Sequence, residues 1–145
     1  MISKIKPDNF NKKFDVVGCF IIHDGKFLIL HRQDYKPQGN TWGVAGGKVH
    51  SDDKDFNHAL SREILEEVGI QINPTELKPI VSYYVQYPEY DFIYHTFHYD
   101  AGENIPTVLL TTDEHKDYKW VTPEESLKLD LIPDEDECIK DFFKI

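Results

Sequence analysis

The most informative part of the chain begins with Gly46-Gly47-Lys48-Val49 and, after a polar loop, continues as Ala59-Leu60-Ser61-Arg62-Glu63-Ile64-Leu65-Glu66-Glu67-Val68-Gly69-Ile70. Its second half predicts a helix on which Glu63, Glu66 and Glu67 share one face, because residues three and four apart lie within an arc of roughly 100°. Three carboxylates at such close range repel one another. The arrangement is tolerated when the groups are solvated, or when a divalent cation lies among them.

The position of these carboxylates on the helical wheel leaves two interpretations open. Phe56 and Leu60 project near the acidic arc, so the arc borders the apolar stripe that is expected to face the core. This favours a cation site, since a purely solvated face would lie opposite that stripe. The alternative is an exposed acidic helix in which Arg62 pairs with Glu66 four residues further on, an arrangement that is common on protein surfaces.

The segments before this helix predict strands. Two apolar runs, Asp15 to His23 and Phe27 to Leu30, are joined by Asp24-Gly25, a dipeptide typical of tight hairpins. Thr41 to Ala45 predicts a further short strand that is closed by Gly46-Gly47. We therefore expect an antiparallel pair followed by a short strand that leads directly to the acidic helix.

The helix itself and the segments after it complete the prediction. The helical pattern runs from Asp55 to Val68, with Gly69 as its C-terminal cap and with candidate N-caps at Ser51, Asp52, Asp53 and Asp55. Strands are then predicted at Val81 to Tyr87, Phe92 to Tyr99 and Tyr118 to Val121, a helix start at Thr122-Pro123, and a last helix at Asp134 to Phe143. Strands interspersed with a few helices predict an α/β fold with a mixed sheet between helices.

The composition of the whole chain narrows the classes of function. The 145 residues suit one domain spanning 1–145, and 40% hydrophobic with 29% charged residues is typical of a globular protein. The net charge of −10 argues against stable binding to nucleic acids or to anionic membranes, which need a basic surface. A polyanionic substrate would then need cations as mediators.

The distribution of apolar residues and cysteines predicts a reduced, cytoplasmic protein. The first residues, Met1 to Lys13, lack the apolar core of a signal peptide, and no later apolar run approaches the roughly 20 residues of a spanning helix. The only two cysteines are Cys19, inside an apolar run, and Cys138, near the end, so a disulfide framework is not expected.

The stretch from the paired glycines Gly46-Gly47 to Ile70 resembles the Nudix box, Gly-x5-Glu-x7-Arg-Glu-(aliphatic)-x-Glu-Glu-x-Gly-(aliphatic). The second half of this pattern is matched in full by Arg62, Glu63, Ile64, Glu66, Glu67, Gly69 and Ile70. In the first half, counting forward from Gly47 places Asp53 at the first Glu position, whereas counting back from Arg62 places Lys54 there. The loop is therefore one residue longer than the pattern, and the supporting role of that first Glu is left open.

Other parts of the chain are similar to the same family, and together they extend the resemblance over roughly residues 15 to 128. Leu28 to Arg32 resembles its early strand, Trp42 to Gly47 its approach to the paired glycines, and Tyr118 to Glu125 its strand-to-helix exit. The resemblance implies a Nudix-like α/β/α sandwich with a mixed central sheet.

The resemblance also implies a divalent-metal site that takes Mg2+, with Mn2+ as the alternative. It assigns the metal ligands to Gly46 through its carbonyl, to Glu63, Glu66 and Glu67, and to a later acidic residue for which Glu114 is the candidate. Glu63 binds metal or activates water in many members, and members differ in where the general base lies. Gly46 also fits a purely conformational role, and Glu114 also fits an ordinary surface acid.

Two further groups of residues carry weaker hypotheses. The box arginine, Arg62, usually orients a glutamate through a bidentate bond and supports catalysis without touching substrate. A base could stack on one of the aromatic residues of the later strands, although such residues more often form strand core. These are Tyr83, Tyr84, Tyr87, Tyr90, Phe92, Tyr94, Phe97 and Tyr99. A zinc site is disfavoured, because His95 and His98 fall on opposite faces of a strand.

The function implied by the resemblance is hydrolysis of a phosphoanhydride bond in a nucleoside diphosphate linked to another group. MutT-like nucleoside triphosphate pyrophosphohydrolases are slightly favoured over hydrolases of nucleotide sugars such as ADP-ribose. An inactive Nudix-like nucleotide-binding or regulatory module is the alternative, and such a module would be expected to lack part of the glutamate pair. The expected partner is a nucleotide-like small molecule, and the resemblance is compatible with a homodimer.

Overall fold

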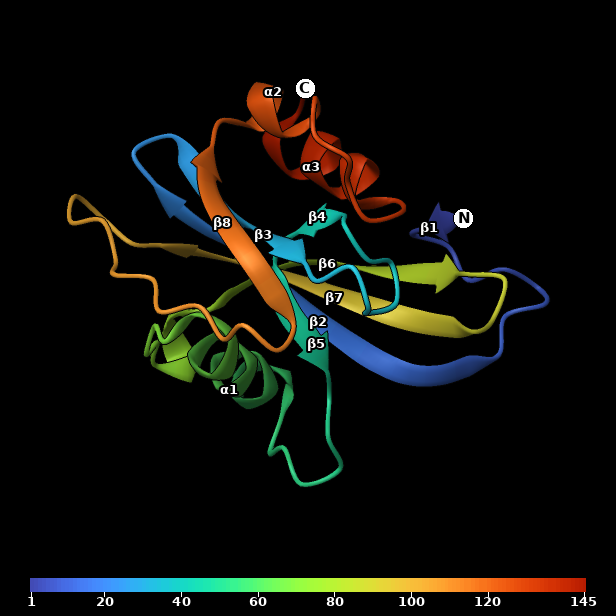
Figure 1. Ribbon diagram of the computed structural model, residues 1–145. Helices are drawn as coiled ribbons and strands as arrows, with labels where there is room; N and C mark the ends of the chain where they lie inside the picture. Colours follow the sequence, from blue (N-terminus) through green and yellow to red (C-terminus); the bar gives the residue numbers. More distant parts are fainter.

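A mixed sheet of eight strands forms the middle layer of the fold (Figure 1). The computed structural model describes residues 1–145. The strands are β1 (Ile2–Ser3), β2 (Lys12–His23), β3 (Lys26–Arg32), β4 (Trp42–Gly43), β5 (Ala45–Lys48), β6 (Lys78–Gln86), β7 (Asp91–Asp100) and β8 (His115–Val121). The helices are α1 (Phe56–Val68), the 3-10 turn η1 (Pro74–Glu76), α2 (Pro123–Ser126) and α3 (Glu135–Phe143).

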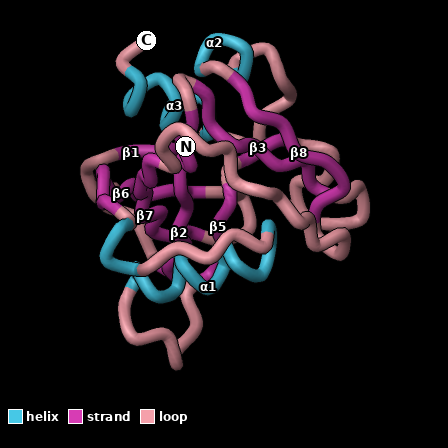
Figure 2. Tube along the Cα trace, turned by 90° about the vertical axis from the view of Figure 1, so that its left-hand side faces the viewer, coloured by secondary structure: helices cyan, strands magenta, loops and turns pink.

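The helices lie on both sides of this sheet. Figure 1 shows α1 below the sheet and α2 and α3 above it, and the view turned by 90° shows the same separation (Figure 2). The predicted α/β/α layering with a mixed central sheet is therefore confirmed. None of the helices has the length and the apolar run that crossing a membrane requires.

Strand β2 is the centre of the sheet. It pairs in parallel with β7 along residues 12–22, and antiparallel with β5 along residues 16–19 and with β3 at residues 22–23. The β2–β3 hairpin turns at Asp24 and Gly25, whose φ angles of 50° and 73° are both positive, as the tight primed turn requires. The hairpin predicted from Asp24-Gly25 is thus confirmed.

Side chains on β2 and β3 alternate between two apolar layers. Val17, Cys19 and Ile21 pack on the α1 side, whereas Phe20 packs on the α3 side. On that second side, Phe142 stacks on Phe20 with 5.0 Å between ring centroids. The sheet is therefore buried on both faces, which explains why these strands read as continuous apolar runs. Cys19 and Cys138 are both buried and free, as expected.

Helix α1 begins and ends where the sequence predicts. The Asp55 carboxylate accepts a 2.8 Å hydrogen bond from the His58 N–H, which selects Asp55 among the candidate N-caps. Gly69 ends the helix at a φ of 70° and donates its N–H to the Leu65 carbonyl at 3.0 Å. The cap at Thr122 is likewise confirmed, because Thr122 and Glu125 form a capping box at the start of α2.

The paired glycines are the main correction to the predicted fold. Gly46 and Gly47 do not close a strand but lie inside β5, where they pair with Gly18 and Val17 of β2. A Cβ at Gly46 would lie 2.0 Å from the Val17 carbonyl oxygen, so only glycine permits this close approach of β5 to β2. The strand therefore continues through the glycines and delivers the chain to the loop before α1.

Several strands are longer than their apolar residues indicate. β2 begins at Lys12, three residues before the predicted start at Asp15, and β8 begins at His115, three residues before Tyr118. Backbone pairing continues past the alternating apolar side chains, since Lys12 pairs with Asp91 of β7. The extension of β8 has a functional consequence, because it places residue 115 in the sheet beside α1.

Candidate active site

Arg62 joins the loop before α1 to the acidic face of the helix. Its Nε and Nη2 lie 3.0 and 2.9 Å from the two carboxylate oxygens of Asp53. Its Nη1 lies 3.1 Å from Glu63 Oε1 and 3.2 Å from Glu66 Oε2. The guanidinium lowers the pKa of Asp53 to about 2 and holds this carboxylate charged. The Arg62 guanidinium therefore fixes three acidic side chains, those of Asp53, Glu63 and Glu66.

This geometry answers the question that the longer loop raises. Asp53, and not Lys54, occupies the position of the first acid of the box, so the count forward from Gly47 is the one that the structure follows. The expectation that Arg62 makes its bidentate contact with a glutamate is wrong, because both nitrogens of that contact meet Asp53. The extra residue follows Asp53 and leaves the Asp53–Arg62 contact intact.

Glu67 is held in a nearly closed position between α1 and β5. Glu67 is only 5% exposed, and its Oε1 accepts a 2.8 Å hydrogen bond from the Gly46 N–H. Burial raises the pKa of Glu67 well above its usual value, and the neighbouring carboxylates of Glu63 and Glu114 act in the same direction. Carboxylates crowded in this way would be stabilised by a cation.

Glu63 depends on the second glycine. A Cβ at Gly47 would lie 2.6 Å from the Glu63 carboxyl carbon, so the missing side chain leaves the space that this carboxylate occupies. Burial raises the pKa of Glu63, whereas the Arg62 guanidinium opposes that shift. Each glycine therefore positions one carboxylate. Gly47 leaves space for Glu63, and Gly46 donates its N–H to Glu67. The orientation of the Gly46 carbonyl as a metal ligand stays a proposal.

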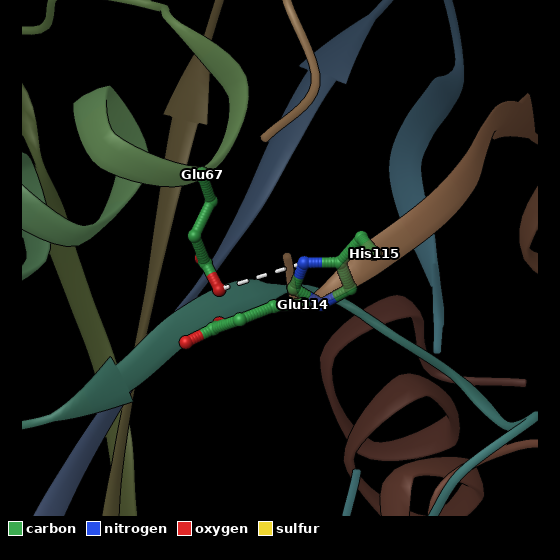
Figure 3. A group of neighbouring side chains, drawn as sticks. All are labelled: Glu67, Glu114 and His115. Atoms are coloured by element: carbon green, nitrogen blue, oxygen red, sulfur yellow. Dashed lines mark ion pairs between the residues drawn. The ribbon is translucent and has the colours of Figure 1, made fainter. Parts of the chain in front are cut away.

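The loop after β7 brings Glu114 to the same place. It is tied to the end of α1 by the N–H groups of Leu109 and Thr111, which donate to the Val68 and Glu67 carbonyls at 2.8 Å each. One ligand atom from each of Glu67, Glu114 and His115 lies within 4.8 Å of the others (Figure 3). Glu114, predicted from its place before β8, therefore lies against the acidic helix.

His115 is a site residue that the sequence did not single out. It is 4% exposed, and its Nδ1 is buried without a hydrogen-bond partner, 3.9 Å from Glu67 Oε2. Burial lowers its pKa to about 4, so the ring is neutral at pH 7. Its position next to Glu114 was the available signal, but no spacing pattern distinguished it from the other histidines.

Glu66 differs from the other carboxylates of the helix. Its side chain is 58% exposed, and its charge acts on Glu63 from the rim. The structure thus brings Glu67, Glu114 and His115 together, places Glu63 beside them, and leaves Glu66 at the edge with Arg62. Oxygen donors of this kind suit Mg2+ or Mn2+, which also retain bound waters.

An apolar cavity of about 150 Å3 opens beside these residues. Gly46, Gly47, Glu67 and His115 form part of its lining. The remaining wall is mainly apolar and aromatic, and it includes Val85, Tyr87, Phe92, Tyr94, Ile132 and Cys138. Of the predicted aromatic cluster, Tyr87, Phe92 and Tyr94 line the cavity. Tyr83 and Phe97 belong to the core and do not line the cavity, and Phe92 belongs to both.

Glu135 is an acidic residue in the wall of this cavity. It is the first residue of α3, is 3% exposed, and has a buried Oε1 without a partner. Burial raises its pKa to about 7, against the opposing effects of the Val44 N–H and the Tyr94 hydroxyl. The sequence shows Glu135 only as one of several acids at a helix start, so nothing distinguished it there.

A second hollow continues from the first across the paired glycines. Its volume is about 410 Å3, and Gly46, Gly47, Tyr87, Phe92 and Arg32 line both spaces. Glu63 and Glu114 lie in its wall together with the basic side chains of Lys48 and His50. An apolar compartment and a charged compartment therefore meet at Gly46-Gly47.

Comparisons with known proteins identify the class. The family model of the NUDIX domain matches residues 12–142. A CTP pyrophosphohydrolase of Escherichia coli K12 is 33% identical over 124 residues, which cover 84% of this chain and 85% of that protein. The nucleoside triphosphatase NudI of Escherichia coli O17:K52:H18 is 30% identical over 129 residues, covering 80% and 86%. The chain belongs to the Nudix family.

Solved structures agree with this assignment. The solution structure of the E. coli ORF135 protein superposes with a TM-score of 0.74 at 28% identity, covering 92% of this chain and 90% of that one. The crystal structure of a MutT protein from Methanosarcina mazei Go1 gives 0.73 at 27% identity, covering 90% and 92%. The resemblance inferred from the box is thus confirmed along most of the chain.

Proposed function

We propose that this chain is a divalent-metal-dependent pyrophosphohydrolase of nucleoside triphosphates, releasing a nucleoside monophosphate and pyrophosphate. The observation that carries the proposal is the meeting of the carboxylate cluster with the apolar cavity at Gly46-Gly47. A nucleotide has the matching halves, an aromatic base and a polyanionic phosphate chain. The names of the two relatives, a CTP pyrophosphohydrolase and a nucleoside triphosphatase, support the same class of substrate.

The charged compartment is suited to the phosphate chain. Glu63 and Glu114 lie in its wall, and Glu67 lines the adjoining cavity. These three carboxylates supply oxygen ligands, and Glu66 adds a carboxylate at the rim. Bound there, a divalent cation would neutralise phosphate oxygens and make a bound water more acidic. Arg32 and Lys48 lie in the walls, where their charges favour the phosphate groups. This local positive charge lets a protein of net charge −10 accept an acidic substrate.

Arg62, held by Asp53, contributes to the reaction by orienting the neighbouring carboxylates. The guanidinium fixes Glu63 and Glu66 from the side of the loop, while the Gly46 N–H fixes Glu67 from the side of β5. Carboxylates that are already oriented lose little freedom when cation and substrate bind, and catalysis by positioning and charge stabilisation depends on such preorganisation. Arg62 is therefore a positioning residue in this proposal.

The apolar compartment is suited to the base. Tyr87, Phe92 and Tyr94 offer ring surfaces, and the unpaired Glu135 oxygen offers one hydrogen-bonding position. A base that fills this space would lie on the far side of Gly46-Gly47 from the second hollow. The phosphates then extend toward Glu63 and Glu114.

A substrate panel tests the proposal. The protein is incubated with Mg2+ and, separately, with each ribonucleoside and deoxyribonucleoside triphosphate and with ADP-ribose, and products are followed by 31P NMR. We expect a nucleoside monophosphate and pyrophosphate from a triphosphate, and no reaction when a chelator replaces Mg2+. Preference for ADP-ribose would contradict the triphosphate assignment. Inertness toward every compound, despite nucleotide binding, would favour the regulatory module.

A further inference from the structure

We propose that His115 Nδ1 is a direct ligand of the divalent cation, which makes this a mixed carboxylate and imidazole site. The inference rests on the proposed function, because it concerns the same metal site. It goes further in adding a nitrogen donor from β8 to the oxygen donors of α1 and the preceding loop. It also implies a metal preference that an all-oxygen site would not have.

The orphaned nitrogen is the first observation. Nδ1 of His115 is buried and has no hydrogen-bond partner. Buried polar atoms in folded proteins nearly always have a partner, so an exception calls for an explanation such as a bound ion. Figure 3 shows the ring edge that carries Nδ1 turned toward the Glu67 carboxylate, with Glu114 alongside. The atom thus faces the carboxylates and not the apolar core.

The spacing of the ligand atoms is the second observation. Nδ1 lies 3.9 Å from Glu67 Oε2, too far for an N–H···O hydrogen bond. Two ligands of one ion, each about 2.1 Å from it, can be separated by up to roughly 4.2 Å. The observed 3.9 Å is within that span, and one atom from Glu114 lies within 4.8 Å of both. Glu67 and His115 are therefore spaced as two ligands of one cation, and a side-chain movement of under about 1 Å would bring Glu114 within the same span.

The nitrogen donor predicts which cation binds best. Mg2+ prefers oxygen, whereas imidazole suits later divalent ions and raises their affinity over that of Mg2+. We therefore expect Ni2+ to bind more tightly than Mg2+, by about tenfold or more in dissociation constant. The His115→Gln variant, which keeps the carboxylates, should lose most of that margin.

Pulsed EPR of the Mn2+-loaded protein tests the ligand directly. The electron-spin-echo modulation should contain coupling to a directly bound 14N, and His115→Gln should lose it while still binding Mn2+. His50→Gln is the matched control, because His50 lies in the wall of the adjoining hollow and should leave the coupling unchanged. Labelling the parent with 15N-histidine should replace the 14N pattern, and that measurement needs no substitution.

The outcomes separate this inference from the proposed function. Mn2+ bound through Glu67 in the parent, without nitrogen coupling, would overturn the role of His115 and leave the hydrolase proposal standing. Nitrogen coupling that persists in a folded His115→Gln protein would also overturn it. Mn2+ binding that is unaffected by Glu67→Gln would contradict both proposals, because the cation would then lie elsewhere.

Discussion

Glu135 is held almost wholly out of water in the wall of the apolar cavity, and its stability contribution depends on its protonation. Burial raises the pKa of the folded carboxyl to about 7, whereas an unfolded glutamate titrates near 4.3. The folded state therefore binds more protons than the unfolded state between these two values. Stability should fall as pH rises through this window and then level off above about pH 7.

The Glu135→Gln variant should remove this dependence. A neutral amide of similar shape has no proton to lose, so its melting temperature should change less between pH 5 and pH 7.5 than that of the parent. Over this window the unfolding free energy of the parent should fall relative to that of Glu135→Gln by a few kcal/mol. Thermal melts at both pH values measure it, and parallel pH curves for the two proteins would contradict the raised pKa of Glu135.

Single residues of the site were predictable to the extent that they follow the helical repeat. Glu63 and Glu67 are buried beside the apolar stripe, as their position on the helix indicated, whereas Glu66, which was predicted on the same face, has an exposed side chain. His115 and Glu135 were not predictable, because each acquires its role from burial by segments distant in the chain. A spacing rule within one helix carries no information on such burial.

At the scale of elements, two glycines let β5 lie close to its neighbours, Gly46 to β2 and Gly47 to α1. The two positions meet different obstacles, backbone at Gly46 and a side chain at Gly47. A Cβ at Gly46 would meet the Val17 carbonyl oxygen at 2.0 Å and the Gly18 Cα at 2.8 Å. At Gly47 the three nearest atoms all belong to the Glu63 carboxyl group, which can rotate away.

Alanine at these two positions should therefore separate stability from activity. Gly46→Ala should lower the melting temperature strongly, since a β2–β5 displacement costs on the order of several kcal/mol. Gly47→Ala should melt within a few degrees of the parent but lose at least about tenfold in kcat, because Glu63 is displaced. Melting curves and steady-state kinetics on both variants check this. Equal melting temperatures for Gly46→Ala and Gly47→Ala would contradict a backbone clash at Gly46.

The crowded carboxylates of α1 destabilise the folded protein when no cation is bound among them. The pKa of Glu67 is raised by burial and by its acidic neighbours, so in the metal-free protein its charge is costly. Glu67→Gln should then raise the metal-free melting temperature modestly, whereas Mg2+ should raise that of the parent by on the order of 5 °C. Glu66→Gln should gain less, because its side chain is exposed to water.

Melting curves with chelator and with millimolar Mg2+ decide this prediction. The exposed residue Glu76 supplies the control, since Glu76→Gln removes the same charge far from the site and should retain the full Mg2+ shift. A shift of equal size in Glu67→Gln would place the cation elsewhere on the acidic surface.

The elements themselves were largely predictable from local patterns. The Asp24-Gly25 hairpin, the Asp55 and Gly69 caps of α1 and the Thr122 cap of α2 all depend on residues close in sequence. The strand through Gly46 and Gly47 was not, because paired glycines ordinarily indicate a turn. Their place in β5 depends on the approach of β2, which is a tertiary contact.

For the whole molecule, the layered fold followed from the order of strands and helices, but the cavity did not. Its walls come from β2, β5, β7, the start of β8 and the start of α3, which pattern reading cannot bring to one place. The charged and apolar compartments are therefore a property of the assembled sheet. From these compartments we infer one central claim, that the carboxylates beside Gly46 and Gly47 drive metal-dependent hydrolysis.

Turnover of a folded Glu67→Gln protein tests this claim most directly. Pyrophosphate release from the best triphosphate is measured at saturating Mg2+ for the parent, for Glu67→Gln and for the control Glu76→Gln. We expect Glu67→Gln to lose at least about a hundredfold in kcat while its circular dichroism spectrum is unchanged, because a charged metal ligand is removed. Glu76→Gln should match the parent. Turnover by Glu67→Gln within a few fold of the parent would contradict the claim.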